Sequence, residues 1–144
     1  MLIKKILLAL IQFHLKILDI GSAQGDLLEH LLIKKNCKVI GIDKEKNARL
    51  AKNIDFLSCD LNKELPDLDY DNFDYILFLD VIEHLENPEN FLSRLYEKIS
   101  DNEKIEIIIS TPNISFFVMR FMLLFGFFNY GKRGILDQTH TRLF

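Results

Sequence analysis

The sequence predicts an α/β fold of three layers, with helices on both faces of a mainly parallel sheet. Apolar runs of strand length alternate along the chain with segments of helical periodicity. The runs are apolar on both faces, as in buried parallel strands. The 144 residues, 49% hydrophobic and 27% charged, suit a single globular domain over residues 1–144. In such sheets, ligands bind beyond the carboxyl ends of the strands.

The predicted elements follow one another without repeats, linkers or low-complexity tracts. Residues 1–16 are expected to form a short amphipathic helix that covers the sheet. Composition and length predict strands at Ile17–Ile20, Lys38–Ile42, Ile54–Leu57, Tyr75–Leu79 and Ile105–Ser110. Helical spacing predicts helices at Asp26–Lys35, Lys44–Lys52, Pro88–Lys98 and Ser115–Phe125. Asn87 is a good N-cap for the third of these, and Pro88 fits its first position.

Charge and cysteine content limit the classes of function. A formal net charge of −3 argues against a protein that binds nucleic acid through phosphate contacts. The two cysteines, Cys37 and Cys59, lack CxxC spacing, which indicates buried thiols in a reduced, cytoplasmic protein without a zinc site. The apolar start of the chain has no small-residue cleavage site, and no run is long enough for a transmembrane segment.

The most informative segment is Ile17–Leu32, which reads ILDIGSAQGDLLEHLL. The turn Gly21–Gly25, with Ser22 inside it, leaves no bulky side chain between a strand and the helix that follows. Such a turn lets a ligand approach the backbone and the free N–H groups of the helix. We therefore expect a nucleotide or cofactor site here.

Carboxylates stand at the ends of the next two strands. Asp43, followed by Lys44, can accept both hydroxyl hydrogens of a ribose, and Asp60 can accept from an exocyclic amine such as that of adenine. Together with Asp19, which precedes the turn, they predict an adenosine pocket at one sheet edge.

The same residues disfavour two other cofactors. Proteins that bind a nicotinamide dinucleotide typically have the motif GxGxxG, but here Ala23 and Asp26 occupy the second and third glycine positions. The Asp26 carboxylate would also repel a pyrophosphate. No GK[ST] sequence follows that would hold a nucleoside triphosphate. A cationic sulfonium with an amino-acid tail suits Asp19 and Asp26 better.

Five segments in order, ILDIGSAQG, GIDKEK, FLSCDL, FDYILFLDVIEHLENPENFLSRL and STPN, resemble class I S-adenosylmethionine-dependent methyltransferases. The closest likeness is to the group labelled methyltransferase type 11, 12 or 23, whose GxLDxTHxRxF signature is similar to GILDQTHTRLF near the end. The resemblance implies a Rossmann-like methyltransferase fold, S-adenosylmethionine as cofactor and a small-molecule acceptor that the sequence does not identify.

The resemblance also implies roles for particular residues. The methionine part of the cofactor would lie against Asp19, Gly21 and Gly25, the ribose against Asp43, and the adenine against Asp60 and Leu61. The expected cofactor contacts are completed by Ser22, Lys44 and Asp80. Ala23 stands where the family usually has glycine, which we expect to be tolerated if the backbone there keeps a negative φ.

Asp80, His84 and His140 are the candidate catalytic residues. Methyl transfer needs positioning, plus a base where the acceptor loses a proton, and the ordinary pKa of histidine suits His84 to that role. The alternative is a structural role, in which His84 caps or packs against an element and hydrogen-bonds the backbone. In the tail, His140 is expected to act as base or orienter and Arg142 to anchor an anion, the alternative being a polar surface loop.

Some relatives bind a divalent cation through a carboxylate-x-x-Glu-His arrangement. Asp80, Glu83 and His84 have that spacing, and His140 would be a fourth ligand. Many members of the family carry Glu-His at this place without a known metal, so we assign no metal ligand and keep a divalent cation at Asp80, Glu83 and His84 as the less favoured alternative.

The most apolar stretch is Ile114–Phe128. It is expected to form a helix that covers the sheet and the acceptor pocket; the alternative is contact with a membrane surface or a lipidic acceptor.

The family fold has seven strands, the last two forming a hairpin. The chain reaches Phe144 after the fifth, so we expect a short domain with an uncovered sheet edge that favours a homodimer. The alternative to an enzyme is a truncated or non-catalytic module that binds the cofactor or a partner.

Overall fold

The computed structural model describes residues 2–44, 54–99, 104–113, 115–127, 131, 135–142 and 144. Its centre is a sheet of five parallel strands in the order β3-β2-β1-β4-β5. The strands are β1 (Lys16–Ile20), β2 (Lys38–Asp43), β3 (Asp55–Ser58), β4 (Tyr75–Leu79) and β5 (Glu106–Ser110). The helices are α1 (Leu2–Leu10), α2 (Asp26–Lys35), α3 (Pro88–Lys98) and α4 (Phe117–Leu124), with short 3₁₀ turns η1 (Tyr70–Asn72) and η2 (Ile82–His84).

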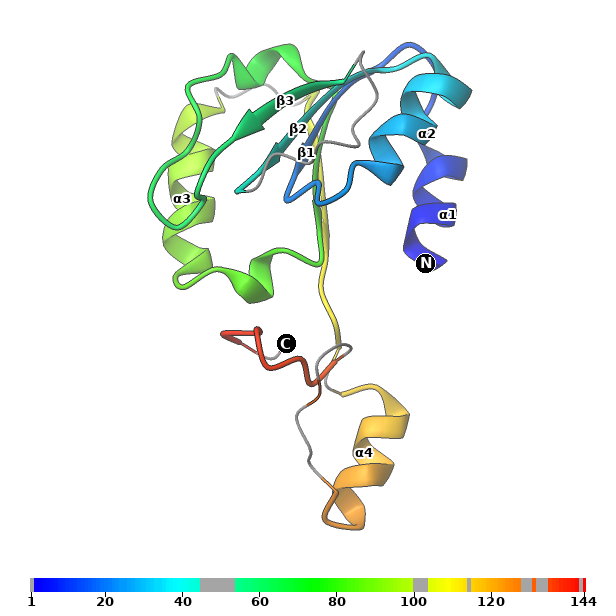
Figure 1. Cartoon of the computed structure of the whole chain (residues 1–144), viewed down its shortest axis with the longest axis vertical. Helices are drawn as coiled ribbons and strands as arrows, with labels where there is room; N and C mark the ends of the chain where they lie inside the picture. The colour runs from blue at the N-terminus through cyan, green and yellow to red at the C-terminus, as the bar shows by residue number, and fades with distance from the viewer. Residues whose placement is uncertain are drawn as a thin grey trace.

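Helices cover both faces of the sheet, as the sequence predicts (Figure 1). Successive residues of the central strands β1, β2 and β4 enter opposite cores, because side chains alternate across a strand. Ile17 packs with α1 and α2 through Leu7 and Leu28, whereas Leu18 belongs to the core on the α3 side with Phe91. The molecule is therefore an α/β/α sandwich, and its strands end together at one edge.

The predicted strands all form, each within one residue of the predicted bounds. The helices predicted at Asp26–Lys35 and Pro88–Lys98 have the predicted bounds, and the Asn87 side chain accepts a 3.0 Å hydrogen bond from the Asn90 N–H as an N-cap. The helix predicted at Lys44–Lys52 lies almost wholly outside the described residues. Both cysteines are free and buried, as predicted.

The prediction for the most apolar stretch is partly wrong. A helix forms, but it is shorter than Ser115–Phe125, and α4 does not cover the sheet. An extended segment after β5 carries α4 beyond the carboxyl ends of the strands (Figure 1), and Met119 is its one buried residue. Apolar composition predicted burial, but the preceding extended segment determines where the helix lies.

β5 is the edge strand of the sheet that the structure describes, and its Ile107 and Ile109 side chains are exposed. Among the described residues, no helix has the length and apolarity needed to cross a membrane.

Candidate cofactor-binding and active site

A cavity of about 390 Å³ opens at the carboxyl edge of the sheet. It is lined by residues that follow β1, β2, β3 and β4. Of the residues predicted from the sequence, the lining includes Gly21, Asp43, Lys44, Asp60, Leu61, Asp80 and His84. The strand ends therefore bring together most of the predicted cofactor residues and two of the three predicted catalytic residues, Asp80 and His84.

The turn between β1 and α2 takes left-handed backbone conformations. Gly21 has φ 77°, and a Cβ there would lie 2.3 Å from Cγ2 of Val81, so no side chain fits. Ala23 has φ 48°, which contradicts the expectation of a negative φ. The turn reverses so tightly that Ala23 occupies a conformation that glycine adopts with less strain.

Asp43 ties β2 to this turn. Its Oδ2 accepts a 2.8 Å hydrogen bond from the Ala23 N–H. The carboxylate therefore lines the cavity with one oxygen directed at the turn backbone.

Asp60 lies across the cavity in a cationic setting. Its Oδ2 is 3.3 Å from Lys44 Nζ and 3.7 Å from Lys63 Nζ, and its Oδ1 accepts from the Asn62 N–H at 3.2 Å. Desolvation opposes ionisation, but the Asn62 N–H and the Lys44 ammonium outweigh it and hold the pKa of Asp60 below its ordinary value. Asp60 is therefore a stable carboxylate acceptor.

Three predicted cofactor residues lie beneath the cavity and not in its lining. Asp19 is 3% exposed within β1, and Gly25 is the left-handed N-cap of α2. Ser22 is buried, and its Oγ has no hydrogen-bond partner among the described residues. In this structure these residues support the turn.

Asp80 occupies a strained position at the end of β4. Its φ is 56°, which is uncommon for a residue other than glycine. Two hydrogen bonds to Ser110 at the end of β5 fix it there: Asp80 N–H to Ser110 O at 3.0 Å, and Ser110 Oγ to Asp80 Oδ1 at 3.1 Å. Strain of this kind is characteristic of functional sites.

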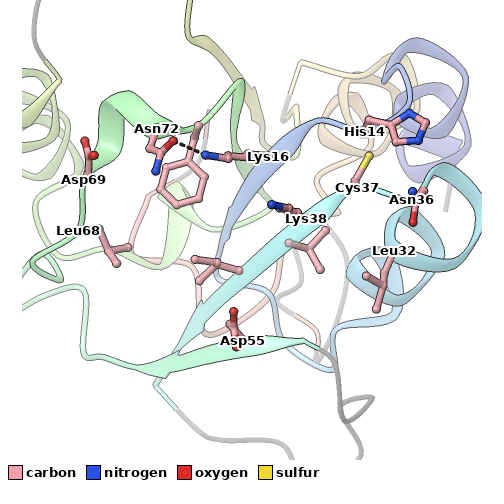
Figure 2. A pocket seen from close by; sticks show the side chains of 13 residues that line it. His14, Lys16, Leu32, Asn36, Cys37, Lys38, Asp55, Leu68, Asp69 and Asn72 are labelled. Carbon is pink, nitrogen blue, oxygen red and sulfur yellow. Dashed lines mark hydrogen bonds between the residues drawn. The ribbon is translucent and has the colours of Figure 1, made fainter.

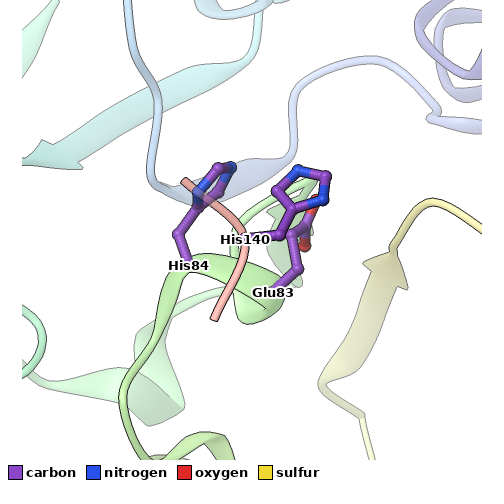
Figure 3. Close-up of side chains that lie close together, drawn as sticks. All are labelled: Glu83, His84 and His140. Atoms are coloured by element: carbon purple, nitrogen blue, oxygen red, sulfur yellow. The ribbon is translucent and has the colours of Figure 1, made fainter. Parts of the chain in front are cut away.

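Glu83, His84 and His140 form a cluster beside Asp80 (Figure 3), with one ligand atom of each within 4.8 Å of the others. The two imidazole rings meet edge to face, with centroids 4.8 Å apart. The sequence predicted both histidines as catalytic and, in the metal hypothesis, as ligands of one ion; in the structure the two rings are in contact.

Glu83 is the unusual member of this cluster. It is 1% exposed, and neither carboxylate oxygen has a hydrogen-bond partner among the described residues. Burial, with the Asp80 carboxylate adding to it, raises the pKa of Glu83 above its ordinary value.

The C-terminal segment, residues 135–142, is fastened to η2 by hydrogen bonds. Thr141 Oγ1 donates to Glu83 O at 2.9 Å and to Leu85 O at 2.6 Å, and the Thr141 N–H donates to Glu83 O at 2.8 Å. His84 Nδ1 lies 3.2 Å from Thr139 O. Arg142, predicted to anchor an anion, forms an ion pair with Glu89. The described segment is thus hydrogen-bonded to η2 and brings His140 to Glu83 and His84, although several of its residues are exposed.

The cluster has a donor set that fits a divalent cation. Two imidazoles and a carboxylate are common ligands of first-row divalent metals, and the buried Glu83 oxygens are unpaired among the described residues. Asp80, the remaining member of the hypothetical ligand set, is directed instead to Ser110.

A larger cavity of about 670 Å³ lies at the opposite edge of the sheet (Figure 2), where Lys16, Lys38 and Asp55 begin β1, β2 and β3. Lys16 Nζ donates to Asn72 Oδ1 there. Its size does not make it the site, because ligands of parallel sheets bind at the carboxyl edge.

Sequence reasoning missed several residues of the site. Asn62 Oδ1 accepts from the Glu86 N–H at 2.9 Å, which joins the loop after β3 to the loop after β4. Cys59, Val81 and Leu85 supply apolar lining. Their positions just beyond the strand ends were the available signal.

Solved structures with the same fold include several methyltransferases. An S-adenosylmethionine-dependent methyltransferase from Archaeoglobus fulgidus matches with TM-score 0.68 and 22% identity over 98% of this chain and 61% of its own. Coclaurine N-methyltransferase, solved with N-methylheliamine and S-adenosylhomocysteine, matches with TM-score 0.57 and 24% identity over 74% of this chain and 34% of its own.

The [4+2]-cyclase SpnF also matches, with TM-score 0.57 and 15% identity over 68% of this chain and 40% of its own. The chain thus spans less than two thirds of the length of each of these proteins. A search of curated proteins found no match.

These likenesses show the Rossmann-like fold of class I methyltransferases, as predicted. A family profile matches residues 3–132, which include every strand and all the cofactor positions discussed above. The chain therefore belongs to the family described as methionine biosynthesis protein MetW.

Proposed function

We propose that this protein binds S-adenosylmethionine at the carboxyl edge of the sheet and transfers its methyl group to a small-molecule acceptor. The observation that carries the proposal is the pair of carboxylates, Asp43 and Asp60, on one cavity with a left-handed backbone turn. That combination suits an adenosine: a carboxylate for the ribose, a carboxylate for the adenine amine, and close backbone approach for the remainder.

The cofactor would supply the methyl group from its sulfonium, and the neutral thioether of S-adenosylhomocysteine would be the leaving group. The residues around the cavity would hold the reacting atoms in line, which is the main requirement of such a displacement. Asp80, fixed at the end of β4 by Ser110, borders the cavity where the chemistry would occur.

The two histidines supply a base for an acceptor that loses a proton. Nδ1 of His84 contacts Thr139 O, and Nδ1 of His140 contacts Ile135 O at 3.2 Å. A carbonyl oxygen only accepts, and the Thr139 hydroxyl, also 3.2 Å from His84 Nδ1, donates to Asp137. These contacts favour a proton on Nδ1, which leaves the lone pair of a neutral ring on Nε2. Of the two, only His84 is in the cavity lining, which makes its Nε2 the better candidate for the base.

A divalent cation at the cluster is a second arrangement of the same site, favoured by the unpaired oxygens of Glu83. Glu83, His84 and His140 would hold it, and it would supply a Lewis acid that lowers the pKa of an acceptor hydroxyl. Electron paramagnetic resonance with Mn²⁺ tests it directly: the arrangement requires stoichiometric binding that Glu83→Gln abolishes.

The alternative function is a module that binds the cofactor or a partner without turnover. The likeness to a [4+2]-cyclase shows that this fold also occurs in a protein not named as a methyltransferase. Binding of S-adenosylhomocysteine without transfer to any member of an acceptor panel would favour the module.

Isothermal titration calorimetry with S-adenosylhomocysteine and with NAD tests the proposal. The expected result is saturable binding of S-adenosylhomocysteine and no heat of binding for NAD. Binding of NAD alone, or of neither ligand, would overturn it.

A further inference from the structure

α4 and the residues beside it form an exposed aromatic surface beyond the carboxyl edge of the sheet. Phe117 is 70% exposed, Phe121 63%, Leu124 78% and Phe125 61%. Phe121 and Phe125 meet edge to face with ring centroids 5.0 Å apart. We name these four side chains the aromatic ridge.

The ridge faces away from the rest of the protein. Phe117, Phe121 and Phe125 are four residues apart and share one side of the helix, with Leu124 next to them. Met119, the one buried residue of α4, lies on the opposite side because it is two positions from both Phe117 and Phe121. The contact that holds the helix therefore directs the ridge outward.

The charge of this region is opposite in sign to that of the whole chain. Between Glu106 and Asp137 the sequence contains no acidic residue and three basic ones, Arg120, Lys132 and Arg133, although the net charge of the chain is −3. Arg120 is exposed on α4 itself, between the ridge and the opposite side. An apolar ridge with an exposed arginine on the same helix complements a bilayer surface, which is apolar inside and anionic at the headgroups.

The size of the ridge argues against a second protein copy as its partner. α4 has eight residues and is about 12 Å long. The four side chains of the ridge, 61–78% exposed, offer roughly 500 Å². A stable protein interface needs about 800 Å² from each partner. A narrow convex ridge of aromatic side chains inserts into a lipid interface without needing a matching concave surface.

We propose that α4 is a membrane-surface element that inserts the aromatic ridge into the interface of an anionic bilayer. Arg120 would reach the lipid phosphates from the side of the helix. α4 lies on the same side of the sheet as the C-terminal segment (Figure 1), so this contact would turn the carboxyl edge toward the membrane. The proposal does not depend on methyl transfer.

Co-sedimentation of the whole chain with vesicles tests the proposal, using phosphatidylcholine alone and phosphatidylcholine with phosphatidylglycerol. We expect binding to the anionic vesicles, at least tenfold weaker binding for the double variant Phe117→Ser/Phe121→Ser, and a smaller loss for Arg120→Gln. Tyr96→Ser, which removes an aromatic side chain that is 74% exposed on α3, is the matched control and should bind as the unsubstituted chain does.

Circular dichroism of each variant reports whether it is folded. Absence of sedimentation with anionic vesicles overturns the proposal, and so does equal sedimentation of the folded double variant. A drop in molar mass by light scattering for the double variant, without vesicle binding by the unsubstituted chain, would identify a second copy as the partner instead. Because vesicle binding needs no cofactor, failure here leaves the calorimetric test of the proposed function unaffected.

Discussion

Ala23 holds a left-handed backbone conformation at the edge of the candidate cofactor site. Ala23→Gly is expected to raise the free energy of unfolding by up to about 1 kcal/mol, because glycine adopts this conformation without the clash of a Cβ. Ala9→Gly, within α1, is the control and should lower it by about 1 kcal/mol. Denaturant unfolding measures both, and loss of stability in Ala23→Gly would contradict the backbone conformation.

The buried hydroxyl of Tyr70 makes the stability of the fold depend on pH. Tyr70 is 1% exposed, its hydroxyl donates to Pro66 O at 2.9 Å, and burial raises its pKa to about 12. The folded chain holds the Tyr70 proton more tightly than the unfolded chain does. The contribution of Tyr70 to the free energy of unfolding is therefore fully present below about pH 10, the pKa in the unfolded chain, and is lost as pH rises through the pKa in the folded chain.

Tyr70→Phe lacks this titration. The unsubstituted chain should therefore lose roughly 2 kcal/mol more stability than the variant between pH 9 and pH 12. Denaturant unfolding at a series of pH values measures the difference, and parallel profiles for the two proteins would refute the assignment.

Single residues also show what the sequence could and could not predict about the site. The position of Asp43 and Asp60 in the cavity lining was predictable, because residues that follow parallel strands all lie at the carboxyl edge of the sheet. The sequence did not predict the left-handed φ of Ala23 or the burial of Glu83, because both depend on contacts with distant parts of the chain.

At the scale of elements, Thr141 fastens the C-terminal segment to η2. Thr141→Val removes the hydroxyl that donates to Glu83 O and Leu85 O, and should weaken the attachment by about 1.4 kcal/mol, or tenfold. Hydrogen exchange of the segment's amides should accelerate accordingly. Thr111→Val, which removes a hydroxyl with no hydrogen-bond partner among the described residues, is the control; equal exchange in both variants would mean that the Thr141 hydroxyl does not hold the segment to η2.

The strands were predicted closely because apolar runs between turn residues have few other solutions in a buried parallel sheet. α4 shows where this reasoning ends. Its apolar composition predicted a buried helix. The helix forms, but most of its side chains are exposed. Only the path of the segment after β5 decides whether such a helix lies against the sheet or beyond it.

For the whole molecule, no described strand pairs with the outer edge of β5, and we expect chains to self-associate there. Ile107→Lys/Ile109→Lys on β5 should weaken self-association about tenfold or more, because charge on an edge strand opposes pairing. Ile33→Lys, at an equally apolar exposed position on α2, is the control. Static light scattering measures the molar mass, and a monodisperse monomer of the unsubstituted chain would contradict this expectation.

The central claim is that the carboxyl edge of the sheet binds an adenosine through Asp43. The affinity for S-adenosylhomocysteine, measured by calorimetry for Asp43→Asn and Asp55→Asn, tests it most directly. Both substitutions remove one carboxylate from a strand of the same sheet, at opposite edges. Binding tenfold or more weaker in Asp43→Asn, with Asp55→Asn unchanged, is the predicted result; equal affinities, or no binding by the unsubstituted chain, would contradict the claim.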